Sequence, residues 1–253
     1  MANMFFKSNL FTSSQDMNKD VSMDWIRFDI RNTYREYCKE LIELGKILTE
    51  SQLEELAVLI YGDLQARVEQ DPIALSTDYI YRLSKSFNII YCYRIAHSVY
   101  NFGGTAEEQM VAKFCAFRLS EEASRRTAIE IHPEAKIGKN FVIDHGINTL
   151  IGATSVIGDN CTLLQNVVLG ARKITFNERG KRHPTLGDNV HVSGGVRILG
   201  PVLVGSHSFI GPDCLIAHDV EPHSKVRMMR KQQVVQAKDN KRVRDKQYFS
   251  SRG

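Results

Sequence analysis

The hydrophobic pattern of the chain changes near residue 130. Before that point, apolar residues recur at intervals of three and four, the spacing that places them along one stripe of an α-helix. After it, aliphatic residues recur at every sixth position, with a slip of two residues after Ile143 and one long interruption at 170–185. Thirteen aliphatic residues keep this hexad phase: Ile131, Ile137, Ile143, Ile151, Ile157, Leu163, Leu169, Leu186, Val192, Ile198, Val204, Ile210 and Ile216.

A period of six fits neither an α-helix nor an alternating β-strand. It is typical of a three-sided parallel β-solenoid, in which each face is one hexapeptide and one aliphatic side chain per face points inward. Hexapeptide coils wind left-handed, an exception to the usual right-handed crossover. The predicted fold class is therefore α+β, with an N-terminal all-helical domain followed by a left-handed parallel β-helix of hexapeptide repeats.

The helical part is predicted to contain four or more helices. Capping-box spacing marks two helix starts, the first at Thr49 with Gln52 or Ser51 with Glu54 and the second at Thr105 with Glu108. The apolar stretch 76–102 predicts a single helix. The predicted organisation is a flexible leader at 1–22, a helical domain at 23–129, a β-helix at 130–224 with a protruding loop at 170–185, and a basic tail at 225–253.

The composition is that of a soluble globular protein, with 43% apolar and 25% charged residues. No apolar run approaches the ~18–20 residues that a membrane span needs. The N-terminal leader lacks a sustained apolar core, so a signal peptide is not expected. Five scattered cysteines without a CxxC pair predict reduced thiols and a cytoplasmic location.

The net charge of +4 is unevenly distributed. From Lys225 onward, ten Lys and Arg residues face two Asp residues, so this tail carries +8 and the rest of the chain −4. A basic tail can attract nucleic acid, but the aromatic side chains that stack on bases are nearly absent there. We expect a solvated, partly disordered end and no nucleic-acid or membrane partner.

Two features inside the repeat region suggest chemistry. The adjacent Asp144 and His145 fall where the hexad phase slips by two residues. A histidine suits proton transfer because its unperturbed pKa lies near neutral pH. The interruption at 170–185 is rich in Lys and Arg and also contains His183, so it could bind a carboxylate or a phosphate. The plainer interpretation is a solvated charged loop.

Six short motifs together resemble the serine O-acetyltransferases, a family of hexapeptide-repeat acyltransferases. The resemblance runs from about residue 60 to 224 and keeps the order of helices followed by solenoid. The motifs are "DP" at Asp71-Pro72, "YRIAH" at Tyr93–His97, "IHPEAKIG" at Ile131–Gly138, "DHG" at Asp144–Gly146, "LLQNVVLG" at Leu163–Gly170 and "RHP" at Arg182–Pro184.

The resemblance implies direct transfer of acetyl from acetyl-CoA to the hydroxyl of L-serine. His145 matches the general base of the family, which takes the hydroxyl proton and returns a proton to the departing thiolate. Glu130 stands where the family has the aspartate that orients this histidine. Its position fifteen residues before His145 is compatible with a contact across one coil, and the alternative is a surface carboxylate at the solenoid entrance.

The resemblance also implies a clamp for the zwitterionic amino acid. Asp71 and Asp144 match the carboxylates that hold its ammonium group, and Arg182 and His183 match the pair that holds its carboxylate as two cations. The alternatives are a turn residue before proline for Asp71 and a plain corner residue for Asp144.

For acetyl-CoA, the family places backbone near the thioester arm at positions matching Gly170, Ala171 and Gly194. The family's Gly-Gly-Thr is replaced here by a stretch with Ala171, and "KVRMMRKQQ" stands where the family has its "GVPA" turn. Lys225 and Arg227 are therefore expected near the phosphates of CoA.

The resemblance implies a homotrimer or a dimer of trimers, with active sites between neighbouring solenoids. The last residue is glycine rather than the isoleucine that family members insert into cysteine synthase, so that complex is not expected. Two alternatives stay open: an acyltransferase with a different amino-acid acceptor or acyl donor, and a catalytically silent β-helix scaffold. A zinc site is not expected, because the solenoid histidines His145, His191, His207 and His218 do not have the spacing of a three-histidine set.

Overall fold

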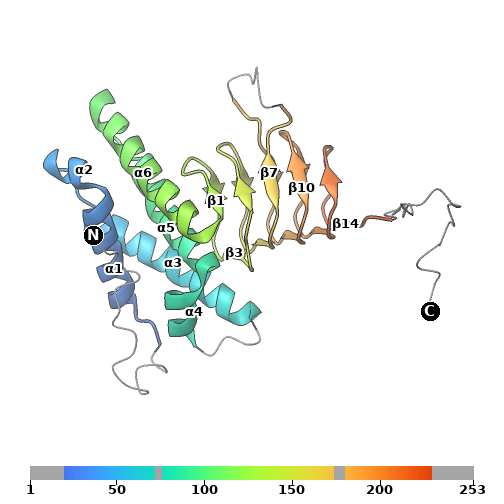
Figure 1. Cartoon of the computed structure of the whole chain (residues 1–253), viewed down its shortest axis with the longest axis horizontal. Helices are drawn as coiled ribbons and strands as arrows, with labels where there is room; N and C mark the ends of the chain where they lie inside the picture. The colour runs from blue at the N-terminus through green and yellow to red at the C-terminus, as the bar shows by residue number, and fades with distance from the viewer. Residues whose placement is uncertain (1–19, 72–75, 174–179, 230–253) are drawn as a thin grey trace, which may run out of the picture.

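The computed structural model describes residues 20–71, 76–173 and 180–229, with the helices at one end of the molecule and the stacked coils at the other (Figure 1). The helices are α1 (Met23–Tyr37), α2 (Lys39–Glu43), α3 (Glu50–Gln70), α4 (Thr77–Leu83), α5 (Lys85–Tyr100) and α6 (Ala106–Thr127). The strands are β1 (Glu130–Ile131), β2 (Lys136–Ile137), β3 (Val142–Ile143), β4 (Leu150–Ile151), β5 (Val156–Ile157), β6 (Thr162–Leu163), β7 (Val168–Gly170), β8 (Thr185–Leu186), β9 (His191–Val192), β10 (Arg197–Leu199), β11 (Leu203–Val204), β12 (Phe209–Ile210), β13 (Leu215–Ile216) and β14 (Lys225–Val226).

Both predicted helix starts have a capping box, and the first is Thr49 with Gln52, not Ser51 with Glu54. The Thr49 hydroxyl accepts from the Gln52 N–H at 3.3 Å and the Gln52 side chain accepts from the Thr49 N–H at 3.0 Å, and the same reciprocal pair starts α6. The stretch 76–102 differs from the prediction of one helix. It breaks at Ser84, whose extended backbone ends α4 and whose hydroxyl caps α5 by accepting from the Phe87 N–H at 3.2 Å.

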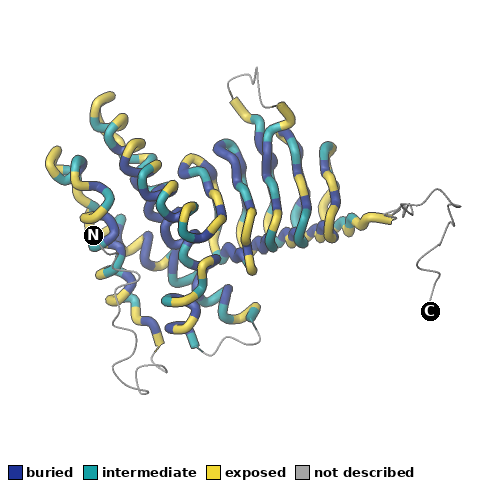
Figure 2. The backbone as a smooth tube through the Cα atoms, viewed as in Figure 1, coloured by how far each residue is buried: buried dark blue, intermediate teal, exposed yellow. Residues whose placement is uncertain are grey.

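The repeat region forms a three-sided parallel β-helix, as its period predicts. Face 1 consists of β1, β4, β7, β10 and β13, face 2 of β2, β5, β8 and β11, and face 3 of β3, β6, β9, β12 and β14. Twelve of the thirteen hexad residues are buried and Ile137 is partly buried against the core. Figure 2 shows the buried positions recurring along every coil. Burying one aliphatic side chain per strand is what stabilises coils of such short strands.

The end of the β-helix and the ends of the protruding loop differ from the prediction. Lys225 and Val226, placed in the tail by the sequence, form β14 and pair with Phe209 and Ile210, so the last coil extends past 224. Gly170 and Thr185 lie in β7 and β8, so the interruption is shorter than 170–185 at both ends. Residues 1–19 of the leader and 230–253 of the tail lie outside the described residues.

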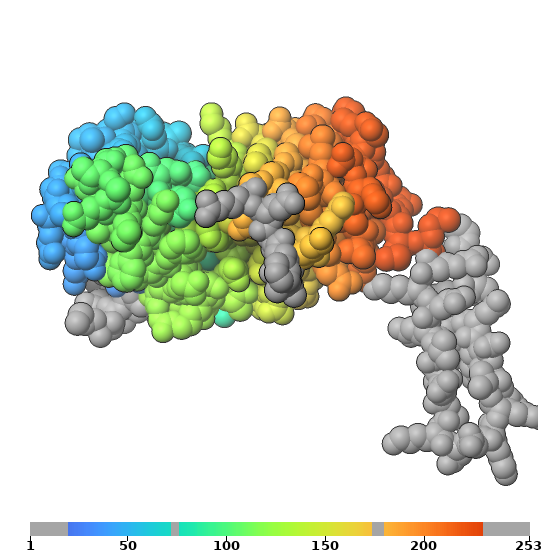
Figure 3. All heavy atoms as spheres, turned by 90° about the horizontal axis from the view of Figure 1, so that it is seen from above, coloured from blue at the N-terminus to red at the C-terminus, as the bar shows by residue number. Residues whose placement is uncertain are grey.

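A buried ion pair joins the helical domain to the first coil. Arg94 on α5 donates to Asp63 on α3 through Nε at 2.8 Å and Nη2 at 3.0 Å, and through Nη1 to the Ile137 carbonyl at 2.6 Å. Asp63 also accepts from the backbone N–H of Phe141 at 2.8 Å. These contacts fix α3 and α5 against the coil, and Figure 3 shows the two parts as one continuous body. The end of α3 follows face 3, where Thr162 donates to the Gln70 side chain at 3.0 Å.

Candidate active site

His145 lies on a corner turn of the first coil that is two residues longer than the same corner of the next coil. Ile151 follows Ile143 by eight positions, whereas Leu169 follows Leu163 by six. His145 and Gly146 both have left-handed backbones, with φ of +59° and +72°. A Cβ on Gly146 would lie 2.5 Å from Ile143 Cγ2, so the turn requires glycine there. The turn projects the His145 side chain outward, where it is 74% exposed.

Asp71 and Asp144 come together beside this histidine. Nη2 of Arg67 lies 2.8 Å from Asp144 Oδ1 and 3.0 Å from Asp71 Oδ2, so one guanidinium bridges both carboxylates. The other oxygen of Asp144 lies 3.8 Å from Nε2 of His145. The end of α3 and the corner turn thus bring Asp71, Asp144 and His145 into one cluster.

Arg67 is a residue of this cluster that sequence reasoning missed. A signal was present, because Asp63, Arg67 and Asp71 recur at four-residue intervals and so lie on one face of α3. Asp63 meets the first coil through Phe141, so the same face carries Arg67 and Asp71 to the solenoid. The Arg67 side chain is 10% exposed and that of Asp71 13%.

Glu130 begins β1 and is exposed, with its N–H donating to the Thr149 carbonyl at 2.9 Å. Its neighbour Ile129 packs near Gly146, so Glu130 starts from the same corner as His145. Across the described residues, the carboxylate that contacts His145 is that of Asp144, and no hydrogen bond or ion pair joins Glu130 to the imidazole. The orienting role of Glu130 stays a prediction.

His183 is built into a different corner, between faces 1 and 2. Its Nδ1 accepts from the Thr154 N–H at 3.1 Å, which leaves the proton of the neutral ring on Nε2. The backbone N–H groups of Arg182 and His183 both donate to the Thr154 hydroxyl at 3.0 Å. The ring lies directly over Gly152, where a Cβ would come within 2.2 Å of Nε2. Gly152 is therefore needed for this histidine to stay in place.

The charge of His183 differs from the sequence expectation. Burial lowers its pKa to about 4, and the nearby cations, Arg182 first, act in the same direction. At neutral pH, His183 is an uncharged N–H donor, so Arg182 is the cation of the expected pair. His132 shares the corner, and burial also lowers its pKa. Lys181 donates to the carbonyl oxygens of Thr154 at 2.7 Å and Pro184 at 3.1 Å, which fixes the chain at the base of the loop.

One chain does not bring these two groups together. Asp144 and His145 occupy the corner between faces 3 and 1, whereas Arg182 and His183 occupy the corner between faces 1 and 2. Face 1 separates the two corners of the prism. Each corner therefore carries half of the predicted amino-acid clamp.

The residues predicted for acetyl-CoA are also dispersed. Gly170 is buried at the end of β7 with Ala171 beside it, and Gly194 lies at the corner between faces 3 and 1. Next to Ala171, the side chain of Arg172 lies on Gly200, whose φ is +95° and whose added Cβ would be 2.5 Å from Arg172 Nε. Arg172 donates to backbone carbonyls of the two following coils, at Leu199 and Ala217.

Lys225 and Arg227 lie at the far end of face 3. Lys225 is exposed in β14, with Nζ 5.3 Å from the ring centroid of Phe209, and Arg227 is exposed just after the strand. A single chain therefore does not gather the five predicted cofactor-binding residues, and their role stays a prediction.

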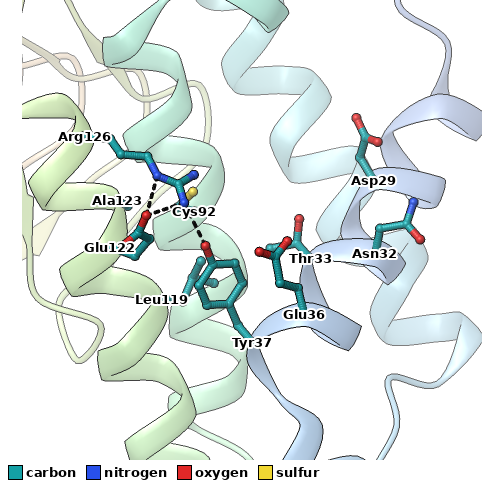
Figure 4. A pocket seen from close by; sticks show the side chains of 10 residues that line it. All are labelled: Asp29, Asn32, Thr33, Glu36, Tyr37, Cys92, Leu119, Glu122, Ala123 and Arg126. Carbon is teal, nitrogen blue, oxygen red and sulfur yellow. Dashed lines mark hydrogen bonds and ion pairs between the residues drawn. The ribbon is translucent and has the colours of Figure 1, made fainter. Parts of the chain in front are cut away.

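A cavity of about 40 Å³ lies elsewhere, inside the helical domain (Figure 4). Arg126 donates to Glu122 and, at 3.0 Å, to the Tyr37 hydroxyl on one side of it. The volume suits one or two water molecules. The residues that line it are Asp29, Asn32, Thr33, Glu36, Tyr37, Cys92, Leu119, Glu122, Ala123 and Arg126. None of the predicted site residues is among them, so this cavity is not the candidate active site.

Within the described residues, no group of three or more His, Cys, Asp or Glu side chains is arranged to hold a metal ion. All five cysteines are buried and free. The helices that the structure describes are too short or too polar to cross a membrane.

Comparison with known proteins gives consistent results in sequence and structure. No protein-family model matches the chain. The serine acetyltransferase of Staphylococcus aureus is 40% identical over 165 residues, which make up 65% of this chain and 72% of that protein. Among solved structures, serine acetyltransferase isoform 3 of Entamoeba histolytica in complex with cysteine has a TM-score of 0.63 at 30% identity, covering 84% of this chain and 72% of that one. The Neisseria gonorrhoeae serine acetyltransferase in complex with serine has a TM-score of 0.64 at 26% identity, covering 83% and 82%. These structures have the left-handed β-helix predicted here.

Proposed function

This chain belongs to the serine acetyltransferase family, and from that premise we propose that it transfers acetyl from acetyl-CoA to the hydroxyl of L-serine with His145 as the general base. The family membership supports the reaction and the co-substrate. The corner turn of the first coil supports the choice of base, because it presents an exposed imidazole beside a carboxylate on a rigid scaffold.

The proposed reaction is a direct transfer. His145 takes the proton of the serine hydroxyl as the oxygen attacks the thioester carbonyl, because a neutral hydroxyl is a weak nucleophile. The tetrahedral intermediate collapses with cleavage of the carbon–sulfur bond. The imidazolium then returns its proton to the CoA thiolate, so the products are O-acetylserine and CoA thiol. Asp144 stabilises the imidazolium, since its Oδ2 lies 3.8 Å from Nε2, and Glu130 orients the ring once substrate is bound.

Serine is held at both charged ends. Its ammonium group binds the carboxylates of Asp71 and Asp144. Its carboxylate binds Arg182 as a cation and His183 as a neutral N–H donor. Because these pairs lie on different corners of the prism, the second pair comes from a neighbouring chain in a three-fold assembly. Acetyl-CoA lies between the same two chains, with backbone at Gly170, Ala171 and Gly194 along its arm and Lys225 and Arg227 near its phosphates.

The proposal depends most on His145, and release of CoA thiol from acetyl-CoA tests it. L-serine, L-homoserine and no acceptor are compared in parallel. We expect serine-dependent release, reduced about 10²–10⁴-fold in His145→Ala. The matched control is His207→Ala, because His207 is also an exposed histidine with a left-handed backbone (φ +60°) on a corner of the same prism. Retention of most activity in His145→Ala would show that the base lies elsewhere. Release with homoserine alone would show a different acceptor.

A further inference from the structure

One guanidinium group links the two carboxylates assigned to the serine ammonium. Arg67 uses a single nitrogen, Nη2, at 2.8 Å from Asp144 and 3.0 Å from Asp71. The link spans two parts of the molecule, because Asp71 ends α3 and Asp144 belongs to the corner turn after β3. Arg67 is almost completely buried at this junction.

We propose that Arg67 is a positioning residue for serine, which fixes the two ammonium-binding carboxylates and matches their charge to one ammonium group. This inference rests on the proposed function, since it deepens the role of Asp71 and Asp144 in binding the acceptor.

Arg67 also offsets the charge of the two carboxylates. Asp71 and Asp144 together carry −2, and Arg67 reduces this to −1. The like charges of the two carboxylates repel each other, and the guanidinium that contacts both offsets this repulsion, so they can stay together when no substrate is bound. One ammonium group then balances the remaining charge of these three side chains.

Arg67 is held in place by the packing of α3 against the first coil. It lies one helical turn after Asp63, whose ion pair with Arg94 and bond from the Phe141 N–H fix α3 against the first coil. The Nε of Arg67 is buried without a hydrogen-bond partner in the described residues. The guanidinium is therefore oriented towards the two carboxylates although this orientation leaves Nε unpaired. A residue needed only to join the two domains would not have to meet both carboxylates.

Steady-state kinetics of the full chain test this inference. Arg67→Gln keeps a hydrogen-bond donor and removes the charge, and Arg67→Lys keeps the charge and removes the planar fork. The matched control is Arg82→Gln, which removes another Arg–Asp pair at i,i+4, between Arg82 Nε and Asp78 Oδ1 at 2.6 Å, on a different helix. KM for L-serine, KM for acetyl-CoA and kcat are measured for each protein, with thermal unfolding as a check on folding.

We expect Arg67→Gln to raise KM for serine at least tenfold and KM for acetyl-CoA less than twofold. The two carboxylates lose the group that holds them in position, so the loss should fall on serine and not on acetyl-CoA. Arg67→Lys should recover part of the loss, and Arg82→Gln should match the unsubstituted enzyme. A merely structural arginine would instead lower the specificity constants for both substrates or the folded fraction.

An unchanged or lower KM for serine in Arg67→Gln would overturn the inference and leave the proposed function intact. If Arg67→Gln does not fold, Arg67→Lys decides on the same readout: an unchanged KM for serine would overturn the inference. Absence of serine-dependent CoA release in the unsubstituted enzyme would instead overturn the proposed function, and the role of Arg67 with it.

Discussion

The two histidines of the proposed site differ because one is buried and the other is exposed. His183 is 8% exposed and its ring lies on Gly152, so burial holds its pKa near 4 and keeps it neutral. His145 projects from a left-handed corner and its side chain is exposed. In the proposed mechanism, His183 as a neutral donor can hold the substrate carboxylate without competing with His145 for the transferred proton.

The low pKa of His183 predicts a dependence of stability on pH. Between its ordinary pKa of 6.5 and about 4, the unfolded chain binds a proton at this residue and the folded chain does not. The stabilisation is therefore fully present above pH 6.5 and is lost as the pH falls towards 4. In His183→Gln, the decrease in Tm from pH 7 to 5 should be smaller by about 2–4 °C, equivalent to about 1 kcal/mol. His97 and His132 shift in the same direction but remain in both proteins. An identical decrease in both proteins would contradict the assignment.

Individual residues could be predicted where the sequence itself marks them. The slip in the hexad phase locates Asp144 and His145 on an irregular corner, and the structure confirms that corner. The charge of His183 could not be predicted, because it depends on burial by Thr154 and Gly152 from another coil. Arg67 could not be assigned a partner, because Asp144 is distant in sequence and meets it only when α3 packs on the first coil.

At the scale of elements, α3 contacts both the domain junction and the proposed active-site cluster. Asp63 holds Arg94 and the first coil, Arg67 bridges the carboxylates, and Asp71 ends the helix beside the corner turn. All three lie on one face at four-residue intervals. A displacement of α3 would therefore disturb the stability of the junction and the geometry of the ammonium site together.

Arg94→Met tests how much this junction contributes to stability. The substitution leaves the Asp63 carboxylate buried without its cation, in a place where burial already raises its pKa. Removing one partner of a buried pair costs about 3–5 kcal/mol, so denaturant unfolding should show a loss of that size. Arg94→Met combined with Asp63→Asn should lose less, because no buried charge remains. A loss under about 1 kcal/mol in the single variant would show that the pair does not hold the domains together.

The elements themselves could be predicted to different extents. The β-helix follows from the hexad because each strand needs only one inward aliphatic residue, and twelve of the thirteen are buried. Helix starts at Thr49 and Thr105 follow from local capping. The break at Ser84 could not be predicted from the pattern, because the apolar periodicity continues through it. The break depends on how α4 and α5 pack in the folded protein. The last strand, β14, escaped prediction because Val226 lies ten residues after Ile216, out of hexad phase.

At the scale of the whole molecule, the site is divided between two corners of a three-sided prism. Asp71, Asp144 and His145 gather at one corner, and Arg182 and His183 at the next. A rigid solenoid cannot fold these corners onto each other. In the proposed mechanism, a neighbouring chain therefore completes each site, and three chains around an axis form three equivalent sites.

The measurement that tests this most directly is complementation between two inactive variants. His145→Ala lacks the base and Arg182→Ala lacks the cation for the substrate carboxylate. Each is prepared alone and the two are co-expressed with different affinity tags, so that mixed assemblies are purified by both tags. Serine-dependent release of CoA thiol is then compared with that of the unsubstituted enzyme.

In a mixed trimer, a site that takes His145 from one chain and Arg182 from its neighbour is intact. Every mixed trimer contains one such site out of three, so mixed trimers purified by both tags should recover roughly a third of the activity while each variant alone stays nearly inactive. Mixed assemblies as inactive as the single variants would show that His145 and Arg182 do not form a site across neighbouring chains.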